Sequence, residues 1–348
     1  MTDATCELVA GEIPILDVAP FLAGEPGARA RLAAQLRWAF ENVGFYYLRG
    51  HGIDSRLIEA TYAAAAALHA LPMERKLALK VDEHNIGYLP MSTGYGARGR
   101  PPSQNEAFFL RRERGPDDPH VLANRRFHAR NRWPDLPGFR ETTLAYMAAL
   151  EALCRRLVRL YAVALDMPED CFDRAYAQPH MILRLSHYPP LDPDADAGFS
   201  LTPHTDSGFM TLLAPNEVPG LSIQLPNGRW IDAPTVADAF VVNGGDILHR
   251  WSNERFLSTP HRVLNLSNRD RYAIPFFCDP DHDTVIECLP SCCSAATPAK
   301  YPPIQMGDYA AWFARRLYAH MAATTAPSDA LIAPGARATE EWRTGLSR

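Results

Sequence analysis

The stretch His204-Thr205-Asp206-Ser207-Gly208-Phe209-Met210-Thr211-Leu212-Leu213 joins two metal-ligating side chains to a short apolar run. Side chains two positions apart on a strand point to the same face, so His204 and Asp206 are predicted to reach a common point. The apolar run Phe209 to Leu213 has turn-forming residues on both sides, as is typical of a buried strand. The stretch therefore predicts β-structure that carries a pair of metal ligands.

Similar short runs lie on both sides of this stretch. From about Met181 onwards, segments rich in Leu, Ile, Val, Phe and Tyr alternate with Pro, Gly, Asn and Asp. Many short strands at such spacing indicate a sandwich or a barrel, and a jelly roll fits best. Besides Phe209 to Leu213, the predicted strands are Met181 to Leu185, Leu221 to Leu225, Ala239 to Asn243, Arg262 to Leu266 and Tyr272 to Phe277.

The remaining chain is mostly helical in pattern, with short extended segments at Ile13 to Leu16 and Gly44 to Leu48. The predicted fold is mixed and mainly β, with a double-stranded β-helix (jelly roll) core flanked by N-terminal and C-terminal α-helices. We expect a helical N-terminal region at 1–178, the jelly-roll core at 179–285, and a C-terminal helix and tail at 286–348. Apolar residues recur at helical intervals in Ala28 to Val43, Ser55 to Leu71, Gly138 to Leu165 and Gly307 to Ala323.

Composition narrows the class of protein. The 348 residues are 47% hydrophobic and 22% charged, which is enough apolar material for a sizeable core. The net charge is −5 and no basic stripe is present, so no nucleic-acid partner is expected. The short basic run of Arg111, Arg112 and Arg114 is interpreted as a solvated surface face. No apolar stretch approaches the roughly 18 residues of a membrane-spanning helix, so no membrane partner is expected.

Cysteine usage and the N-terminal residues indicate a compartment. The first ten residues lack the charged start and the apolar run of a signal peptide. The seven cysteines are an odd number without paired spacing, and the cluster Cys288, Cys292 and Cys293 lacks the CxxC unit of a thiol zinc site. Reduced thiols are the rule in the cytosol. We therefore predict a cytoplasmic protein, with a monomer as the default state.

His261 is the leading candidate for a third ligand beside His204 and Asp206. It lies at the start of the predicted strand Arg262 to Leu266. Two histidines and one carboxylate on neighbouring strands leave coordination positions open, which is the arrangement that non-haem iron(II) oxygenases require. Alone, His-x-Asp is a common pattern that a surface or turn role also explains, and it is the surroundings of His261 that favour iron.

Arg271 opens the run Arg271-Tyr272-Ala273-Ile274-Pro275-Phe276-Phe277, shortly after His261. A buried arginine at a strand start needs an anionic partner, because an unpaired charge inside a barrel is costly. A dicarboxylate co-substrate would supply one, since a guanidinium group binds a carboxylate through two parallel hydrogen bonds. A structural ion pair and an exposed strand end are the alternative interpretations.

Several ordered motifs carry a family resemblance. They are Ile13-Pro14-Ile15-Leu16-Asp17, Gly44-Phe45-Tyr46-Tyr47-Leu48, Gly50-His51-Gly52-Ile53, Leu183-Arg184-Leu185-Ser186-His187-Tyr188-Pro189-Pro190, His204-Thr205-Asp206-Ser207-Gly208-Phe209, Asn243-Gly244-Gly245-Asp246 with Arg250-Trp251-Ser252-Asn253, Ser258-Thr259-Pro260-His261-Arg262-Val263, and Arg271-Tyr272-Ala273. With these motifs, the chain resembles the 2-oxoglutarate/Fe(II) oxygenases related to isopenicillin N synthase. The resemblance spans residues 11 to 320, nearly the whole chain.

The resemblance implies iron(II) bound by His204, Asp206 and His261. It also implies that Arg271 binds the far carboxylate of 2-oxoglutarate and that Tyr188 donates a hydrogen bond to it. The implied activity is the oxidation of a small organic substrate by hydroxylation, desaturation or cyclisation, as in secondary metabolism, with release of succinate and CO2. The implied cofactors are Fe(II), 2-oxoglutarate and O2, with ascorbate as an added reductant.

Two positions depart from the family pattern. The family's serine two residues after the arginine is Ala273 here, and its common asparagine before the Tyr-Pro pair is Ser186. A lost hydrogen bond to a charged group costs about 1.5–3 kcal/mol if nothing replaces it. Either a water replaces it or the co-substrate binds more weakly. We predict that Ser186 belongs to the co-substrate pocket and alters it.

Two alternatives to a 2-oxoglutarate-dependent enzyme are open. An iron oxidase of the same fold would use O2 without 2-oxoglutarate, and its arginine would bind a substrate carboxylate. The alanine at Ala273 makes this alternative more plausible. A non-catalytic barrel would bind a small acid without reacting with it, but the intact ligand set argues against such a protein.

Other polar residues have structural interpretations. His51, between two glycines, and Asp246, after two glycines, are predicted to stabilise turns. His249 is placed in a connecting strand between the two ligand strands, and strand alternation turns His187 away from the face of Tyr188.

Substrate contacts are sought in the Gly/Pro-rich stretch 98–109, which contains Arg98, Arg100, Gln104, Asn105 and Phe108. This stretch resembles the family's loop near the active-site mouth. Loops of this kind often carry specificity, although an ordinary surface loop is the equal alternative for any single residue. Phe209 and Phe277 are predicted to fill the core.

Overall fold

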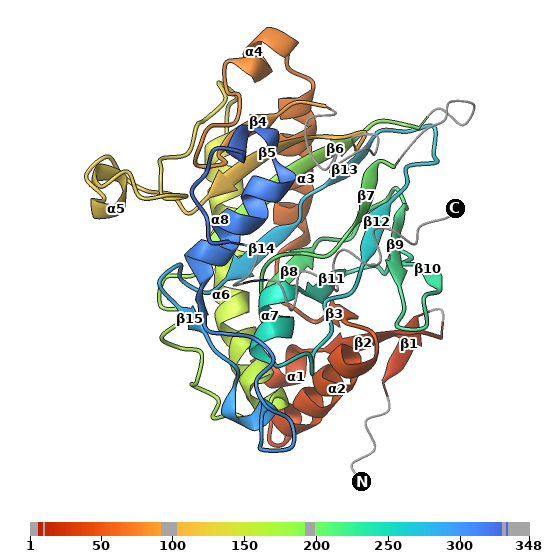
Figure 1. Cartoon of the computed structure of the whole chain (residues 1–348). Coiled ribbons are helices and arrows are strands. Elements are labelled where there is room, and N and C mark those ends of the chain that lie inside the picture. Colours follow the sequence, from red (N-terminus) through yellow and green to blue (C-terminus); the bar gives the residue numbers. More distant parts are fainter. Residues whose placement is uncertain (1–5, 10, 92–102, 192–198, 329–331, 333–348) are drawn as a thin grey trace.

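The computed structural model describes residues 6–9, 11–91, 103–191, 199–328 and 332 (Figure 1). The strands are β1 (Glu7–Val9), β2 (Ile13–Asp17), β3 (Phe45–Arg49), β4 (Gly87–Leu89), β5 (Glu106–Arg111), β6 (His180–Tyr188), β7 (Leu201–His204), β8 (Met210–Leu213), β9 (Leu221–Gln224), β10 (Trp230–Asp232), β11 (Ala239–Gly244), β12 (His261–Val263), β13 (Arg271–Ala273), β14 (Phe276–Asp279), β15 (Val285–Ile286) and β16 (Ile304–Gln305). The helices are α1 (Ala19–Leu22), α2 (Ala28–Asn42), α3 (Ser55–His69), α4 (Met73–Leu77), α5 (Pro119–Leu122), α6 (Phe139–Ala164), α7 (Asp246–Trp251) and α8 (Met306–Leu317), with 3-10 turns at Pro290–Cys292 and Ala319–Met321.

Two sheets form the centre of the molecule. The large sheet has the strand order β1-β2-β3-β11-β8-β14-β6-β5-β4, with β13 also paired to β6. The small sheet has the order β10-β9-β12-β7. Neighbouring strands in both sheets are antiparallel except for β2 and β3, which are parallel. Apolar side chains of β9, such as Ile223, pack with those of β2, β3 and β11, so the small sheet covers one end of the large one.

The two faces of the large sheet have different coverings, because successive side chains on a strand alternate between faces. On the outer face, Leu183, Leu212 and Phe276 pack with side chains of α2, α3 and α6 in the main hydrophobic core. The inner face is covered by the small sheet at one end. At the other end, around β4 and β5, it is covered by α8, whose Ala311 and Ala314 pack with Phe109. One cavity described below lies between the inner face and the small sheet, and the other lies between the inner face and α8.

The predicted helices are present, but the N-terminal region is not only helical. Strands β1 to β5 precede residue 178 and join the same large sheet as the strands that follow it. Most of the predicted strands form within one or two residues of their predicted bounds. The predicted strand Tyr272 to Phe277 is instead two strands, β13 and β14, separated by Ile274 and Pro275. A proline cannot donate a backbone hydrogen bond to a ladder, which explains the interruption.

Two further predictions about local structure are wrong. The connection that carries His249 is the helix α7 rather than a strand. Arg111, interpreted as part of a solvated face, is 4% exposed at the end of the buried strand β5, because strand alternation turns it to the inner face. Its neighbour Arg112 is partly buried and pairs with Glu151.

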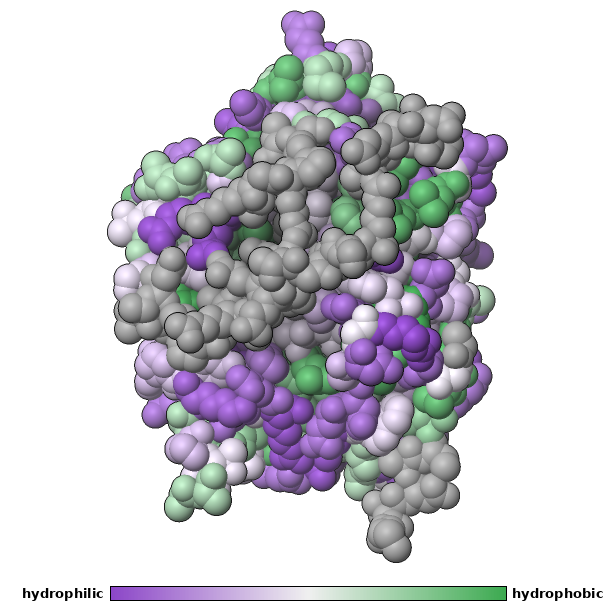
Figure 2. All heavy atoms as spheres, turned by 45° about the vertical axis from the view of Figure 1, so that its right-hand side comes forward, coloured by the Kyte–Doolittle hydropathy of each residue, from purple (hydrophilic) through white to green (hydrophobic). Residues whose placement is uncertain are grey.

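Neither the described helices nor the described surface in Figure 2 shows a long apolar stretch of the kind that spans a membrane. In the described part of the chain, no helix combines the length and apolar character needed to cross a membrane. Among the described residues of the face in Figure 2, hydrophobic side chains occur in small groups between hydrophilic ones. The cysteines are all free thiols, as predicted from their spacing.

Candidate functional site

The three predicted metal ligands meet at the open end of the small sheet. His204 is the last residue of β7 and His261 is the first residue of β12, and the two residues are direct partners in the antiparallel β7–β12 pair. Asp206 lies two residues beyond the end of β7, in the turn that leads to β8. The pairing of β7 with β12 therefore brings the two histidines together, and the turn after β7 brings Asp206 to the same point. All three residues are buried.

The spacing of the three side chains suits one shared ion. Asp206 Oδ1 lies 3.8 Å from His204 Nε2 and 3.7 Å from His261 Nε2. These distances are too long for hydrogen bonds. Two atoms that each bind one divalent ion at about 2.1 Å can lie at most about 4.2 Å apart, so an ion fits between each pair.

Backbone contacts hold both imidazoles in the orientation that a metal needs. His204 Nδ1 lies 2.8 Å from the carbonyl oxygen of Thr202, and His261 Nδ1 lies 3.2 Å from that of Thr259. A proton on each Nδ1 satisfies these contacts and leaves the Nε2 lone pairs directed at Asp206. Burial and the adjacent His261 lower the pKa of His204 to about 3, so this imidazole is neutral at physiological pH.

Two side chains from the large sheet fix the carboxylate of Asp206. Thr211 Oγ1 donates a hydrogen bond of 2.6 Å to Asp206 Oδ2, and Asn243 Nδ2 donates one of 2.8 Å to the same oxygen. Burial raises the pKa of Asp206, but the neighbouring histidines and these two donors outweigh it, and the pKa lies below its ordinary value. Oδ2 is thus held by the protein while Oδ1 faces the imidazoles. Both donors escaped sequence reasoning, although each is a polar residue at an inward position of an apolar strand.

We expect Thr211→Val to weaken iron(II) binding by about 10- to 100-fold, because it removes one of the two donors to Asp206 while keeping the side-chain shape. Thr211→Ser restores the hydroxyl and is expected to bind iron like the parent. Anaerobic titration of each purified variant with iron(II) measures the effect. Equal affinities in the valine and serine variants would show that this hydrogen bond does not support the site.

A first cavity extends from the three ligands along the inner face of the large sheet. Its walls are mainly apolar, and Arg271 lies in it as a buried cation, 2% exposed. Arg271 Nε donates to the carbonyl oxygen of Val218 at 3.1 Å, while its Nη1 is buried without a hydrogen-bond partner. Burial lowers the pKa of Arg271 from a very high starting value. This cavity, named the Arg271 cavity below, therefore offers unused guanidinium donors in an enclosed space next to the ligand triad.

The other predicted co-substrate residues lie on β6, the strand that pairs with the strand of Arg271. Tyr188 lines the cavity and pairs with Arg271 in the β6–β13 ladder, with the guanidinium carbon 5.2 Å from the centre of its ring. Ala273 lines the cavity as well. Ser186 is the direct partner of Ala273 across the same ladder, and its Oγ is buried without a hydrogen-bond partner. The hydroxyl missing at Ala273 thus has a counterpart on the facing strand.

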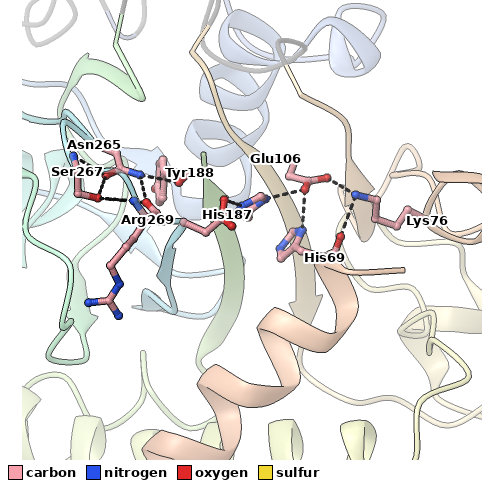
Figure 3. A network of polar contacts seen from close by, with 9 residues as sticks. His69, Lys76, Glu106, His187, Tyr188, Asn265, Ser267 and Arg269 are labelled. Atoms are coloured by element: carbon pink, nitrogen blue, oxygen red, sulfur yellow. Dashed lines mark hydrogen bonds and ion pairs between the residues drawn. The ribbon is translucent and has the colours of Figure 1, made fainter. Parts of the chain in front are cut away.

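A second group of ligand-type side chains lies on the other side of β6. It consists of His69 at the end of α3, Glu106 on β5 and His187 on β6. Figure 3 shows Glu106 between the two histidines and Lys76. Glu106 Oε1 lies 2.8 Å from His187 Nδ1, and Glu106 Oε2 lies 2.8 Å from Lys76 Nζ. An ammonium group at this distance repels a metal ion, so the group is a closed charge network.

The charges of this network are set by its hydrogen bonds. Burial disfavours the charged forms, but contacts with His187, His69, Lys76 and Tyr88 lower the pKa of Glu106 far below its ordinary value. Burial also opposes protonation of His187, and its contacts with Glu106 and Asp270 outweigh this and raise its pKa. His187 contacts Glu106 while Tyr188 lines the Arg271 cavity, so the two side chains face opposite ways, as strand alternation predicts.

The remaining candidate residues serve local structure. His51 Nδ1 accepts a hydrogen bond from the backbone N–H of Ile53, which stabilises the predicted turn. His249 Nδ1 contacts the carbonyl oxygen of Phe256. Asp246 begins α7 and accepts hydrogen bonds from Ser258 Oγ and Tyr309 Oη. None of these three residues is among the ligand-type groups found in the described residues.

The stretch 98–109 has a different outcome from the predicted loop. Arg98 and Arg100 lie outside the described residues, and residues from Glu106 onwards form β5. Asn105 is buried and donates to the carbonyl oxygen of Ser200, and Phe108 belongs to the main core. Phe209 is in the core as predicted, while Phe277 lines the Arg271 cavity.

Comparisons with known proteins agree with this geometry. Residues 13–136 match the family described as non-haem dioxygenase in morphine synthesis N-terminal, and residues 179–280 match the 2OG-Fe(II) oxygenase superfamily. The 2-oxoglutarate-Fe(II) type oxidoreductase hxnY of Emericella nidulans is 37% identical over 304 residues, covering 85% of this chain and 87% of hxnY. The 2-oxoglutarate-dependent dioxygenase citB of Monascus ruber is 35% identical, covering 78% of this chain and 85% of citB.

A solved structure with bound 2-oxoglutarate (alpha-KG) is also similar to this chain. The crystal structure of a full-length Neurospora crassa protein in complex with alpha-KG and thymine superimposes with a TM-score of 0.76 at 29% identity, covering 88% of this chain and 97% of the Neurospora chain. The chain therefore belongs to the 2-oxoglutarate/Fe(II) oxygenase superfamily. It is a 2-oxoglutarate-Fe(II) type oxidoreductase that acts on small substrates.

Proposed function

We propose that His204, Asp206 and His261 hold iron(II) at the end of a jelly-roll core, and that Arg271, Tyr188 and Ser186 bind 2-oxoglutarate beside it. The observation that carries this proposal is the convergence of two imidazoles and one carboxylate next to a buried, partly unsatisfied guanidinium group. The two packed antiparallel sheets support the jelly-roll assignment.

The residues of the Arg271 cavity fit both groups. Two neutral imidazoles and a carboxylate are the ligand set of non-haem iron(II) oxygenases and leave positions open for co-substrate and O2. The Nη1 group of Arg271 lacks a partner, and a carboxylate would satisfy it through a charge-assisted hydrogen bond. When bound, iron(II), 2-oxoglutarate and O2 supply the oxidising power and release succinate and CO2.

The protein's own residues orient and shield these groups. Thr211 and Asn243 hold Asp206 so that one carboxylate oxygen stays directed at the two imidazoles. Arg271 would hold the far carboxylate of the co-substrate in the cavity that it shares with the three ligands. The apolar cavity walls exclude water, which strengthens these polar contacts.

The substrate is proposed to be a small organic molecule that is hydroxylated, desaturated or cyclised. The solved Neurospora crassa complexes contain thymine or 5-formyluracil, and the solved JOX2 complex contains JA beside 2OG and Fe. A cytoplasmic monomer that takes ascorbate as an added reductant remains the prediction for this chain.

Stoichiometry tests the proposed use of 2-oxoglutarate. We expect one succinate for each substrate oxidised, and slow succinate release with iron(II) and ascorbate when the substrate is omitted. An iron oxidase that takes all its electrons from its own substrate would consume O2 without forming succinate. Iron binding without any consumption of O2 or 2-oxoglutarate would contradict the catalytic assignment.

A pair of variants tests the role of Ser186. We expect Ser186→Ala to raise the KM for 2-oxoglutarate by roughly 10- to 100-fold, because it removes a hydrogen bond to a charged group. Ala273→Ser in the same variant places a hydroxyl on the facing strand and is expected to return the KM toward the parent value. Initial rates of succinate formation measure both effects. An unchanged KM in Ser186→Ala would exclude the hydroxyl from the co-substrate site.

A further inference from the structure

A second cavity lies on the inner face of the large sheet, between strands β5, β6 and β14 and the helix α8. Its walls include Arg111 at one end and Asp206 and Ser207 at the other. The cavity, named the Arg111 cavity below, thus reaches the carboxylate of the ligand triad from the side opposite the small sheet. A molecule within it would lie against the metal centre.

The register of the sheet fixes how Arg111 and Asp206 are related. Arg111 pairs with Ile182, which pairs with Phe277, which in turn pairs with Thr211. Thr211 is the residue whose hydroxyl holds Asp206. Three strand spacings of about 4.8 Å separate the backbones of Arg111 and Thr211 by about 14 Å. Arg111 and Asp206, which Thr211 holds, therefore line the cavity from positions about three strands apart.

Arg111 is a buried cation with spare donor capacity. Its Nε donates to the carbonyl oxygen of Asn85 at 3.4 Å, its Nη1 lies 2.5 Å from His180 Nε2, and its guanidinium carbon lies 4.7 Å from the centre of the Phe127 ring. Its Nη2 has no hydrogen bond, and no carboxylate forms an ion pair with Arg111, among the residues that the structure places. Arg112 and Arg114, its neighbours in sequence, both have such partners.

The acidic residue in this cavity does not neutralise Arg111 by contact. Asp279 lines the same cavity, but its Oδ1 accepts the backbone N–H of Phe209 at 2.7 Å. Burial raises the pKa of Asp279 to about 7, so this carboxyl group is only partly ionised near neutral pH. Burying an unpaired cation is costly, and an anion from outside the protein would offset that cost.

The cavity has polar walls, among them the buried side chain of Arg184, and aromatic walls that suit a flat apolar body. Phe109, Phe127, Phe277 and Phe313 line it, and α8 closes it with small and apolar side chains. Pockets of this kind bind a small molecule by apolar walls and orient it with a few polar groups. Aromatic walls next to a buried guanidinium group are the features that would recognise a ring compound carrying a carboxylate.

We propose that the primary substrate is a small planar ring compound that carries a carboxylate, and that Arg111 binds this carboxylate. The inference rests on the proposed function, because it places the substrate in the Arg111 cavity beside the iron ligands. The carboxylate end is held at β5, and the opposite end of the ring system is presented to the metal centre. Arg111 is then a substrate-binding residue that sets specificity, separate from the co-substrate anchor Arg271.

The first test compares matched probes on the intact protein. Benzoate and 1-naphthoate are titrated against benzamide and 1-naphthamide by calorimetry, anaerobically, with iron(II) and saturating 2-oxoglutarate so that Arg271 is already occupied. At least one acid is expected to bind at least 10-fold more tightly than its amide. Equal binding of acid and amide, or no binding of any probe, would overturn the inference.

Variants then locate the charge that the acid meets. Arg111→Gln is expected to remove the preference for the acid, and Arg111→Lys to keep part of it. Arg112→Gln is the matched control, because Arg112 follows the end of β5, pairs with Glu151 and does not line the cavity, and this variant is expected to keep the full preference. A preference that survives in Arg111→Gln would overturn the assignment. If Arg111→Gln does not fold, Arg111→Lys and Arg112→Gln still test the assignment. A preference for the acid that is equal in these two variants would contradict a role for Arg111.

The two proposals fail in different ways. Succinate release without added substrate tests the iron and 2-oxoglutarate site and does not depend on Arg111. Loss of that release would contradict the proposed function, whereas normal release together with no preference for an acid would contradict only the substrate class.

Discussion

His204→Ala is expected to lower succinate formation by more than about 100-fold and to abolish tight iron(II) binding. Loss of a residue that only orients a ligand typically costs about 10- to 100-fold in metal affinity, and loss of the ligand itself costs more. The remaining pair, Asp206 and His261, would hold the ion through two contacts only. Iron content after anaerobic dialysis and the rate of succinate release are the two measurements.

The second histidine group offers a matched control for this variant. His187→Ala removes an imidazole that also lies beside another histidine and a carboxylate, in the network of Figure 3. The carboxylate of Glu106 is already paired with the ammonium group of Lys76, so this group is not expected to bind iron. His187→Ala is therefore expected to retain the iron bound by His204, Asp206 and His261. Loss of iron from His187→Ala with retention in His204→Ala would reverse the assignment of the two groups.

Arg271→Gln is expected to raise the KM for 2-oxoglutarate by at least about 100-fold. A carboxylate bound by two charge-assisted hydrogen bonds loses roughly 1.5 kcal/mol or more for each, and every 1.4 kcal/mol is a factor of ten. The ligand triad is left in place, so kcat at saturating co-substrate is expected to fall much less. Initial rates of succinate formation over a range of 2-oxoglutarate concentrations separate the two constants.

Arg269→Gln is the control for the loss of a positive charge nearby. Arg269 precedes Arg271 by two residues, is largely exposed, and pairs with Glu217 at the surface. An exposed ion pair contributes little, so this variant is expected to resemble the parent. Similar KM values in the two glutamine variants would show that the effect is one of general charge, and that Arg271 does not bind the co-substrate.

Local sequence patterns were sufficient to predict the four longest helices, α2, α3, α6 and α8, and many of the strands. The periodic apolar residues of α2, α3 and α6 lie in the main core, and Gly44 and Gly138 stand just outside the helices that they bound. Patterns of this kind depend on neighbours a few residues away. The incorporation of β1 to β5 into the large sheet depends on pairing between distant segments, such as β3 with β11, and no local pattern encodes it.

The candidate site divides in the same way. His204 and Asp206 are found from their spacing, and His261 from its place at the start of a later strand. The support of Asp206 by Thr211 and Asn243 could not be predicted, because it requires the register of β8 and β11. Arg111 was misread for a related reason. A short run of arginines is typical of an exposed face, whereas Arg111 ends the buried strand β5 and the other two arginines lie beyond that strand.

Phe277 forms part of the wall of both the Arg271 cavity and the Arg111 cavity. A ring shared by two adjoining compartments cannot shift for one occupant without changing the space left for the other. If filling one compartment changes the affinity of the other, thermodynamic linkage requires the reverse effect to be equally large. Substituting Phe277 is therefore expected to change ligand binding in both cavities. Measuring the affinity of each ligand with and without the other ligand would separate the effect on one cavity from the effect on the other.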